Sequence, residues 1–512
     1  MDLVFFEMAL VTCNFASFLL SPDQRSWNKL IKKQVLMGNV RQAIQSYIDM
    51  LDSGFFADNF TFPILLKASN FCSGLQLHGQ SIKSGFSDHV YVQTALIKVY
   101  SDFGQNDNAR KVFDKMPLKD SVAWNSMLDA YASNGQMGVA MELFDAMPVK
   151  DVSSYNIVVS GFAGERRIES ARKVFDEMPV RDVISWNSMI LACVNAGDIV
   201  EAHALFEEAP WRNVVTWNTM ITGCVHNQLY TEAVHLFNKM KTGNADPDYL
   251  TVTTALSACA HLRSLEAGVK VDVYARNHGQ AASPHVVTAL IDMYAKCGSI
   301  QNALEVFFKS QVKDIYCWNA MISGLALHGH GNSALKLFDE MRESGVKPDD
   351  VTFIGLLSAC SHAGLVQEGC QLFGSMERDF KISPKIEHYG CMVDLLSRAK
   401  LLNRAFQFVE TMPFEPGESI LGALLSACVI HQDLHTGEKV VKLICKKANN
   451  RLSDGEYMMF SNLYASCSQW EEANKWRSMM NDSGIVKTAG CSTIEANEKF
   501  HKFLAGEVGF EF

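Results

Sequence analysis

The sequence contains no C-x-x-C motif, the spacing that many zinc sites and redox disulfides share. It has 14 cysteines in 512 residues, yet no two of them stand three positions apart. Three cysteines instead end the same apolar phrase, "ALSAC" or "LLSAC", at Cys259, Cys360 and Cys428. A cysteine that recurs in one apolar phrase is typical of a small side chain in a packed core. We therefore expect reduced, buried thiols rather than a disulfide framework.

The sequence also has fewer basic than acidic residues. The 46 Lys and Arg residues are outnumbered by 56 Asp and Glu residues, which gives a net charge of −10. A protein that binds nucleic acid mainly through charge would be basic, so the composition argues against non-specific binding of polyanions. The first 24 residues contain no Lys or Arg, unlike a secretory signal or an Arg-rich transit peptide. The apolar run at 8–20 is too short to span a bilayer, and we expect a soluble chain.

Internal repeats, by contrast, fill the sequence. Trp124, Tyr155, Trp186 and Trp217 follow one another at intervals of 31 residues, inside phrases such as "AWNSML", "SWNSMI" and "TWNTMI". The spacing places unit starts at 24, 59, 90, 121, 152, 183, 214, 249, 284, 315, 350 and 386, with two divergent units from 417 and about 451. Such an array needs no single central core, because each unit packs on its neighbours.

Each unit has the pattern of two amphipathic helices. In "SWNSMILACVNAG" (185–197) the apolar residues fall at i, i+3, i+4 and i+7, and we predict that Ser185 is the N-cap and that Gly197 ends the helix. The phrase "ARKVFDEM" (171–178) predicts the second helix, and a proline follows the second helix in four units, at Pro117, Pro148, Pro179 and Pro210. The predicted fold is an all-α, right-handed superhelical solenoid of stacked helix-turn-helix repeats with a concave groove.

The repeated phrases carry a family resemblance. They include "SWNSMI", "NALEVF", "MYAKCGSIQ", "SGVKPDDVTFIGLLSACSHAGLVQEG" and "EHYGCMVDLLSRA". The period of 31, 35 or 36 residues differs from the fixed 34 of the tetratricopeptide repeat. The chain resembles plant pentatricopeptide repeat proteins, in the PLS class that mixes long, short and standard motifs.

The C-terminal phrases narrow this resemblance to the E subgroup. "ILGALLSACVIHQDL" and "YMMFSNLYASCSQWEEANKWRSMM" are similar to the two E motifs, and "EKFHKFLAG" is similar to the start of an E-plus extension. The expected domains are an N-terminal segment at 1–23 with an atypical targeting role, an array of about 12 repeats at 24–416, two degenerate E motifs at 417–494 and a truncated E-plus-like tail at 495–512.

Two polar positions recur in the units, the fifth residue and the last, which we call the polar pair. Asn at the start of a helix and Asp before the next helix can both be explained as caps or favourable charges. The resemblance implies instead that the pair recognises one RNA base per repeat. The predicted RNA-binding residues are Asn28, Asp58, Thr94, Asp120, Asn125, Asp151, Asn156, Asp182, Asn187, Asn213, Asn218, Asp248, Thr253, Ser283, Thr288, Asp314, Asn319 and Asp349. Pairs such as Pro63 with His89 and Ile354 with Lys385 fit no such rule.

The chemistry of the last residue predicts which base is bound. A carboxylate only accepts hydrogen bonds, so Asp suits the N3–H of uracil or the N1–H of guanine, whereas an Asn amide can donate to cytosine N3. The resemblance alone associates Asn at the fifth position with pyrimidines and Thr with purines. It also implies that the array runs parallel to the RNA, so the units from 90 to 248 are expected to bind GUUCU.

Zinc-dependent cytidine deamination needs an H-x-E and a C-x-x-C motif, and the sequence has neither, although it has 15 histidines. The resemblance therefore implies a non-catalytic specificity factor for C-to-U editing of single-stranded organellar RNA, without cofactor, membrane or small-molecule substrate. A separate DYW-type cytidine deaminase and multiple organellar RNA editing factors are the expected partners, in the mitochondrion or alternatively the chloroplast. An RNA binder for splicing, processing or stability, and a protein scaffold, stay open.

Overall fold

The computed structural model describes residues 23–243, 245–448, 452–486, 491–496 and 499–504. The chain divides into two compact parts, residues 1–227 and 228–512, and each is described by itself. The expected segment at 1–22 and the end of the predicted tail at 505–512 lie outside the described residues.

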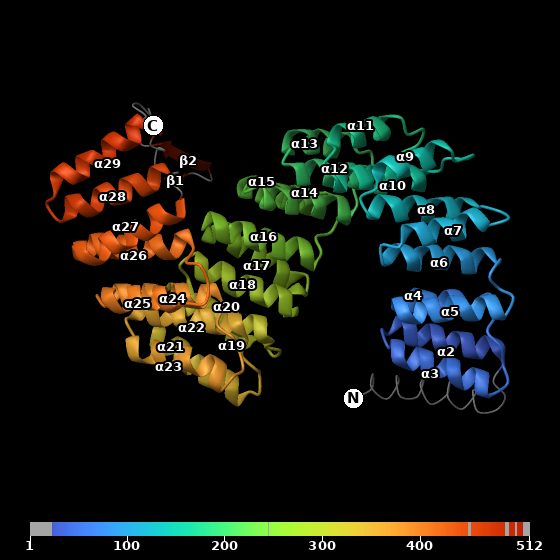
Figure 1. The fold of residues 1–512 in the computed structure, drawn as a ribbon, viewed down its shortest axis with the longest axis horizontal. Coiled ribbons are helices and arrows are strands. Elements are labelled where there is room, and N and C mark those ends of the chain that lie inside the picture. The colour runs from blue at the N-terminus through green and yellow to red at the C-terminus, as the bar shows by residue number, and fades with distance from the viewer. Residues whose placement is uncertain (1–22, 244, 449–451, 487–490, 497–498, 505–512) are drawn as a thin grey trace. The chain divides into compact units, whose positions relative to one another are not determined.

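The first part consists of helix pairs. Its helices are α2 (Gln24–Leu36), α3 (Val40–Asp52), α4 (Thr61–Ala68), α5 (Phe71–Lys83), α6 (Val90–Asp102), α7 (Asn106–Lys115), α8 (Ser121–Ser133), α9 (Met137–Asp145), α10 (Val152–Gly164), α11 (Ile168–Asp176), α12 (Val183–Ala196), α13 (Ile199–Glu208) and α14 (Val214–His226). Successive pairs stack along this part, and the first helix of each pair packs against the first helix of the next, as α8 does against α10 (Figure 1).

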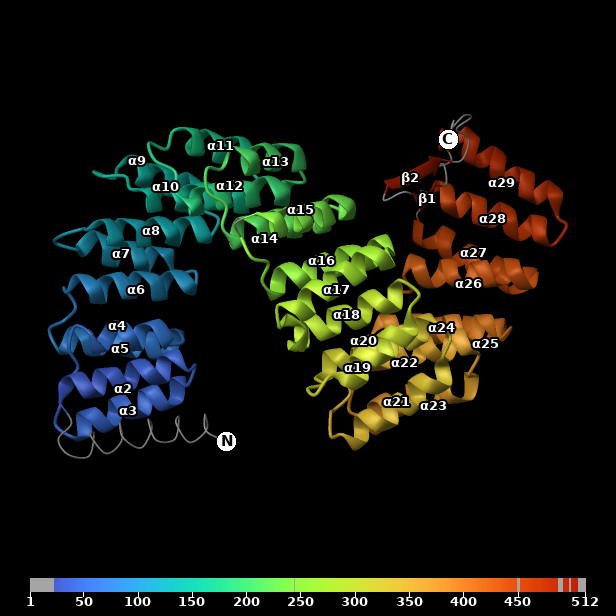
Figure 2. The ribbon, with the colours of Figure 1, turned by 180° about the vertical axis from the view of Figure 1, so that it is seen from behind.

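The second part repeats this arrangement. Its helices are α15 (Tyr230–Thr242), α16 (Tyr249–Leu262), α17 (Leu265–Asn277), the 3-10 helix η1 (Gln280–Ala282), α18 (Pro284–Lys296), α19 (Ile300–Lys309), α20 (Ile315–Leu327), α21 (Gly331–Glu343), α22 (Asp350–Ala363), α23 (Val366–Arg378), α24 (Ile386–Arg398), α25 (Leu402–Thr411), α26 (Glu418–His431), α27 (Leu434–Ala448), α28 (Asp454–Ser466) and α29 (Trp470–Asp482). Figure 2 shows the same stacking from behind. The predicted all-α architecture of stacked helix pairs is confirmed. No helix of the described residues is both long and apolar enough to cross a membrane.

The starts of the first helices are set by the last residue of the preceding unit. Asp182 is the N-cap of α12, and its carboxylate accepts a hydrogen bond from the Ser185 N–H at 2.8 Å. The Ser185 hydroxyl accepts in return from the Asp182 N–H, which completes a capping box. The prediction of Ser185 as the N-cap was therefore wrong, because both polar residues take part and Asp182 stands outside the helix. Gly197 ends α12 with a φ of 82°, as predicted.

The recurring aromatic residue joins neighbouring units. The indole of Trp186 packs edge to face on Phe175 of the preceding second helix, with ring centroids 5.1 Å apart and an interplanar angle of 79°. The same contact recurs in the pairs Phe113–Trp124, Phe144–Tyr155, Phe206–Trp217 and Phe307–Trp318. Such a contact contributes about 0.5–1.5 kcal/mol beyond burial of the ring surfaces. An aromatic residue at this step of the repeat therefore helps to lock one unit to the next.

The cysteines of the repeated phrase lie in the core, as expected. Cys259, Cys360 and Cys428 form no disulfide with any described residue and have no exposed surface. Burial raises the pKa of both Cys360 and Cys428 to about 12. These thiols stay protonated at neutral pH and act as small apolar side chains.

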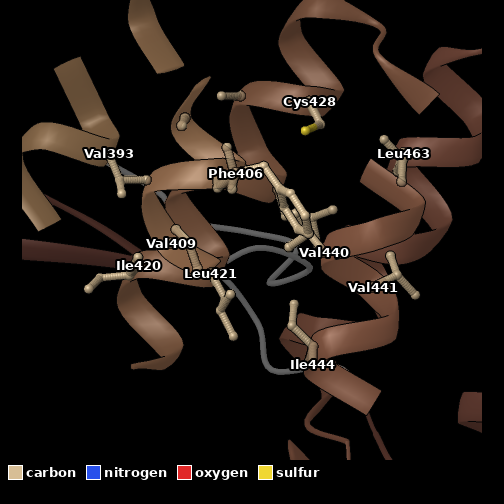
Figure 3. Packing of buried hydrophobic residues seen from close by; sticks show 14 of the residues in the cluster. Val393, Phe406, Val409, Ile420, Leu421, Cys428, Val440, Val441, Ile444 and Leu463 are labelled. Carbon is tan, nitrogen blue, oxygen red and sulfur yellow. The ribbon is translucent and has the colours of Figure 1, made fainter. Parts of the chain in front are cut away.

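The C-terminal helix pairs continue the stack without a break in the core. One hydrophobic cluster runs from Val393 on α24 to Met480 on α29. Figure 3 shows three members of this cluster from successive helices: Phe406 of α25, Ile420 of α26 and Val440 of α27. The region with the E-like phrases therefore shares buried surface with the last repeats and is packed as part of the same body.

A β-hairpin follows the helices, which the all-α prediction did not include. Strand β1 (Cys491–Ala496) pairs antiparallel with β2 (Lys499–Leu504), with Cys491 opposite Leu504 and Ala496 opposite Lys499. Both strands have six residues, too few for a stable helix pair. The sequences "CSTIEA" and "KFHKFL" do not alternate strictly between polar and apolar residues, so periodicity alone would not have predicted these strands.

Candidate nucleic-acid interface

The two members of a polar pair meet across neighbouring first helices. The Asn28 side-chain amide on α2 donates to both carboxylate oxygens of Asp58, with N–O distances of 3.2 Å to each. The Asn125 amide on α8 donates to both oxygens of Asp151, at 3.1 and 3.2 Å. The fifth residue of one unit thus lies against the residue that precedes the next first helix. The pair spans the seam between two units.

The same contact recurs in both parts of the chain. The Asn156 amide donates to Asp182 at 3.3 Å in the first part, and the Asn319 amide donates to Asp349 at 3.0 Å in the second. Asn218 lies in the first part and Asp248 in the second, so their pair is not described. In this structure, which holds no RNA, the Asn–Asp bond also ties successive units together.

Each last residue in these pairs also caps a helix. Asp151 accepts from the Ser154 N–H at 2.8 Å and Asp349 accepts from the Thr352 N–H at 2.9 Å. A carboxylate offers about four acceptor sites, and at Asp151 the cap and the Asn125 amide supply two donors. Capping therefore leaves acceptor capacity on the carboxylate for a further donor.

Hydrogen bonding lowers the pKa of two carboxylates of the polar pairs, Asp182 and Asp58. Burial alone would raise the pKa of Asp182, but hydrogen bonds from the backbone and hydroxyl of Ser185 and from the Asn156 amide outweigh it, and its pKa is lowered. The pKa of Asp58 is lowered in the same way, because donors on Thr61, Phe60 and Asn28 outweigh burial. Both groups are acceptors at neutral pH.

The unit 183–213 ends in an amide instead of a carboxylate. The Asn213 Oδ1 accepts from the Thr216 N–H at 2.9 Å and from the Thr216 hydroxyl at 3.0 Å. Because the cap occupies the oxygen, it fixes the orientation of the amide and leaves the Nδ2 group for another partner. At Asp182 the three hydrogen bonds all go to Oδ1, which leaves Oδ2. Both side chains are exposed, one presenting a donor and the other an acceptor.

The oxygen of the fifth residue differs among the Asn units. The Oδ1 atoms of Asn125, Asn156 and Asn187 are buried and have no hydrogen-bond partner among the residues that the structure describes. By contrast, the Asn28 and Asn319 oxygens each accept from a threonine hydroxyl, at 2.7 Å in both cases. A buried oxygen without a partner is destabilising by about 1–3 kcal/mol.

The threonine pairs are not joined in this way. The Thr94 hydroxyl donates to the Val90 carbonyl at 2.8 Å, and the Thr253 hydroxyl donates to the Leu250 carbonyl at 2.9 Å. The Thr288 hydroxyl lies 3.2 Å from the sulfur of Cys317. Three predicted pairs, Thr94–Asp120, Thr253–Ser283 and Thr288–Asp314, therefore lack the bond across the seam that the Asn–Asp units have. Asp120 and Asp314 still cap their helices, by accepting from Ala123 and Cys317 at 2.8 and 2.9 Å.

The sequence analysis missed the second residue of each unit. It is an exposed apolar side chain in most units, three positions before the fifth residue on the same helix face. Its exposed fraction is 62% at Ile184, 57% at Val215 and 65% at Tyr316. The further members are Phe60, Tyr91, Val122, Leu250 and Val351. The signal was an apolar residue outside the buried stripe of each first helix, repeated beside the polar pair.

The fold and the site define a class: an α-solenoid repeat protein with a polar pair in most units and an exposed apolar residue beside it in many of them. The chain matches the PPR repeat at 94–120, 122–152, 153–183, 184–214, 285–315 and 351–379, the PPR repeat family at 212–261 and 313–362, and the E motif at 431–495. It belongs to the pentatricopeptide repeat family, in the PLS class and the E subgroup.

Relatives in Arabidopsis thaliana cover nearly the whole chain. Pentatricopeptide repeat-containing protein At3g29230 is 49% identical over 493 residues, which cover 94% of this chain and 81% of that protein. Pentatricopeptide repeat-containing protein ELI1, chloroplastic, is 40% identical over 490 residues, which cover 95% of this chain and 67% of that protein.

Solved structures show a similar fold. The crystal structure of the pentatricopeptide repeat protein PPR10 from maize has a TM-score of 0.60 at 17% identity, covering 91% of this chain and 74% of that one. PPR10 in complex with an 18-nt psaJ RNA element has a TM-score of 0.52 at 19% identity, covering 92% and 72%. At this identity the likeness concerns the fold.

Proposed function

We propose that this protein binds single-stranded RNA with one repeat per base and acts as a specificity factor for C-to-U editing in an organelle. The observation that carries the proposal is the recurrence of one arrangement along the array: an Asp or Asn that caps a first helix, an Asn amide on the preceding first helix and, in most units, an exposed apolar residue beside them. Such a seam combines an apolar contact for the base with one polar group for its pairing edge.

The base chosen at each seam follows from the atom that capping leaves. Asp182 leaves Oδ2, an ionised acceptor, which suits the N3–H of uracil. Asn213 leaves Nδ2, a donor, which suits the N3 acceptor of cytosine. Ile184 and Val215 are exposed apolar neighbours of the pair, and the proposal assigns them contacts with the base faces. The chain's net charge of −10 is consistent with binding that depends on these contacts rather than on charge.

The E motif at 431–495 supports an editing role within the family. We propose that the deaminase is a separate DYW-type protein and that multiple organellar RNA editing factors assist it. Relatives with chloroplastic names support an organelle, for which we propose the mitochondrion, with the chloroplast as the alternative.

The purified chain is expected to bind no stoichiometric zinc and to deaminate no cytidine, because its sequence holds no H-x-E and no C-x-x-C motif. Metal analysis and an RNA deamination assay on the same preparation check this. One tightly held zinc ion per chain, together with activity, would overturn the proposal that the deaminase acts in trans.

A binding selection from a random RNA pool tests recognition. The units from 90 to 248 should enrich GUUCU, with U and C specified most sharply by the pairs Asn156–Asp182 and Asn187–Asn213. Specific binding without that motif would contradict the assignment of bases to seams. The absence of any RNA binding would favour a protein scaffold.

A further inference from the structure

The first part of the chain contains a groove that differs from the other seams. It has a volume of about 780 Å³ and lies over α2, α4, α6 and α8. Its lining includes Lys32, Lys67 and Lys98, which are the ninth residues of the first three units. In the next four units the ninth residue is Asp129, Ser160, Leu191 and Thr222. Lysine at this position is therefore confined to the N-terminal end of the array.

Two of these lysines are available for an anion. Lys98 is already held by Asp102 and Asp129, at 3.3 and 3.0 Å. Lys32 and Lys67 are exposed, and neither is paired with a carboxylate among the residues that the structure describes. The helix α2 (QRSWNKLIKKQVL) contains four basic residues and no acidic one, although the chain as a whole is acidic. The groove lysines that are not paired with a described carboxylate, Lys32 and Lys67, therefore lie on α2 and α4.

The same groove carries two exposed aromatic rings. Phe60 and Tyr91, the second residues of the units 59–89 and 90–120, are 58% and 59% exposed. The corresponding positions at Val122, Ile184 and Val215 are aliphatic. An aromatic face stacks on any of the four bases, and stacking is therefore largely independent of sequence.

The polar pair of the unit 59–89 fits no rule of base recognition. The Pro63 side chain has no hydrogen-bonding atom, and it lines the groove where other units have Asn or Thr. The His89 ring is engaged by the Asn59 amide at 3.2 Å and packs against Tyr91, with ring centroids 5.5 Å apart. The seam with the aromatic rings and the unpaired lysines therefore lacks the polar fifth residue that units such as 90–120 and 121–151 have.

We propose that this groove anchors the RNA without base choice, by stacking one nucleotide on Phe60 and Tyr91 while Lys32 and Lys67 contact the adjoining phosphates. The proposal rests on the proposed RNA-binding function and deepens it, since it assigns affinity to one seam and specificity to others. Free ammonium groups and exposed aromatic rings are the combination with which proteins hold single strands of any sequence.

The test is the salt dependence of binding to a synthetic RNA that spans the repeats and contains GUUCU. The variant K32Q/K67Q is compared with K111Q/K173Q, which removes the same charge from exposed lysines on the second helices α7 and α11. Between about 50 and 200 mM KCl, K32Q/K67Q should reduce the slope of log Kd against log salt by about 1.4, or about 0.7 for each lysine that no longer neutralises a phosphate. The control should keep the wild-type slope.

Two further measurements complete the test. Changing the nucleotide opposite the unit 59–89 to each of the other bases should alter wild-type affinity by less than about twofold, and replacing both rings (F60L/Y91L) should weaken binding to all four RNAs by about tenfold. Equal salt slopes for the two lysine variants, or strong preference for one base at this position, would overturn the anchor. Failure of the wild type to discriminate bases opposite the units 152–213 would instead overturn the proposed function.

Discussion

The units 152–182 and 183–213 have the same length, and each consists of two helices. Each is also followed by a capping box at the start of the next first helix. The two units nevertheless present opposite hydrogen-bonding groups. Asp182 and Asn213 each use one oxygen to cap the next first helix. The atom that remains is a carboxylate oxygen in one unit and an amide NH₂ in the other. The cap holds the side chain in place and determines which atom is exposed, so capping leaves that atom available for the proposed contact with a base.

The two units also show what the capping interpretation explains and what it does not. Capping accounts for Asp or Asn as the last residue, since both are favoured N-caps. It does not account for Asn at the fifth position, which is explained by the bond from Asn156 to Asp182. Since Asn187 Oδ1 is buried without a partner, the unit 183–213 lacks the stabilisation that the Thr61 and Thr352 hydroxyls give to Asn28 and Asn319.

The largest expected effect is on stability and concerns the aromatic contact that packs the two units together. Replacing Phe175 by Ala removes a fully packed ring and its contact with Trp186, at the seam between the two units. The free energy of unfolding should fall by about 3–5 kcal/mol, as measured by urea denaturation. Val180→Ala, at a position that is 65% exposed, is the control and should change stability by less than about 0.5 kcal/mol. A small effect of Phe175→Ala would show that the aromatic pair does not join the units.

The next effect should make the two units alike. Asp182→Asn keeps an oxygen for the cap and exposes a donor in place of an acceptor, as Asn213 does. The unit 152–182 should then prefer cytosine over uracil, with a change in preference of about tenfold or more, since a base-edge contact is worth about 1–3 kcal/mol. Binding to two RNAs that differ only at that base measures it. If the variant still prefers uracil, the difference between Asp182 and Asn213 does not determine the base.

Removing the cap itself should have a smaller effect on stability. Asp182→Ala removes the acceptor for the Ser185 N–H and should lower the free energy of unfolding by about 1 kcal/mol. Asp182→Asn should cost less, because its amide oxygen can still cap. If both variants lose the same stability, the charge of Asp182 rather than its hydrogen bond supports the helix.

The smallest expected effect concerns pH. The pKa of Asp182 is lowered in the folded state, so its contribution to stability is present above the unfolded pKa of about 4 and is lost as the pH falls through the folded value. Asp182→Asn has no titrating group at this position. The stability difference between wild type and variant should therefore shrink toward acid pH. Unfolding measured from neutral to acid pH checks the direction, and a difference that grows toward acid pH would contradict it.

Sequence alone predicted the stacked helix pairs and the buried cysteines, because apolar residues at helical spacing and at a fixed repeat period leave few alternatives. It misplaced the N-cap of α12, since Asp182 and Ser185 are both good capping residues and only the backbone shows which one stands outside the helix. It placed the second helix at 171–178, whereas α11 spans Ile168–Asp176. Periodicity marks the buried face of a helix better than its ends.

The contacts within the polar pairs could not be predicted from the sequence, for a different physical reason. The two members of a polar pair stand about a full unit apart, so their contact depends on how neighbouring units pack. Asn and Asp meet at the seam, as at Asn319 and Asp349, but the shorter Thr288 side chain bonds to Cys317 instead. Exposed apolar residues such as Ile184 were overlooked because only the buried stripe was used to identify the first helices.

The central claim is that the exposed atom of the capping residue selects the base, and Asn213→Asp tests it most directly. The substitution keeps an oxygen for the Thr216 N–H and replaces the free NH₂ with a carboxylate oxygen. The ratio of affinities for two RNAs with C or U opposite the unit 183–213 should change from favouring C to favouring U, by about tenfold or more. An unchanged ratio in a variant of normal stability would mean that Asn213 only caps α14 and recognises no base.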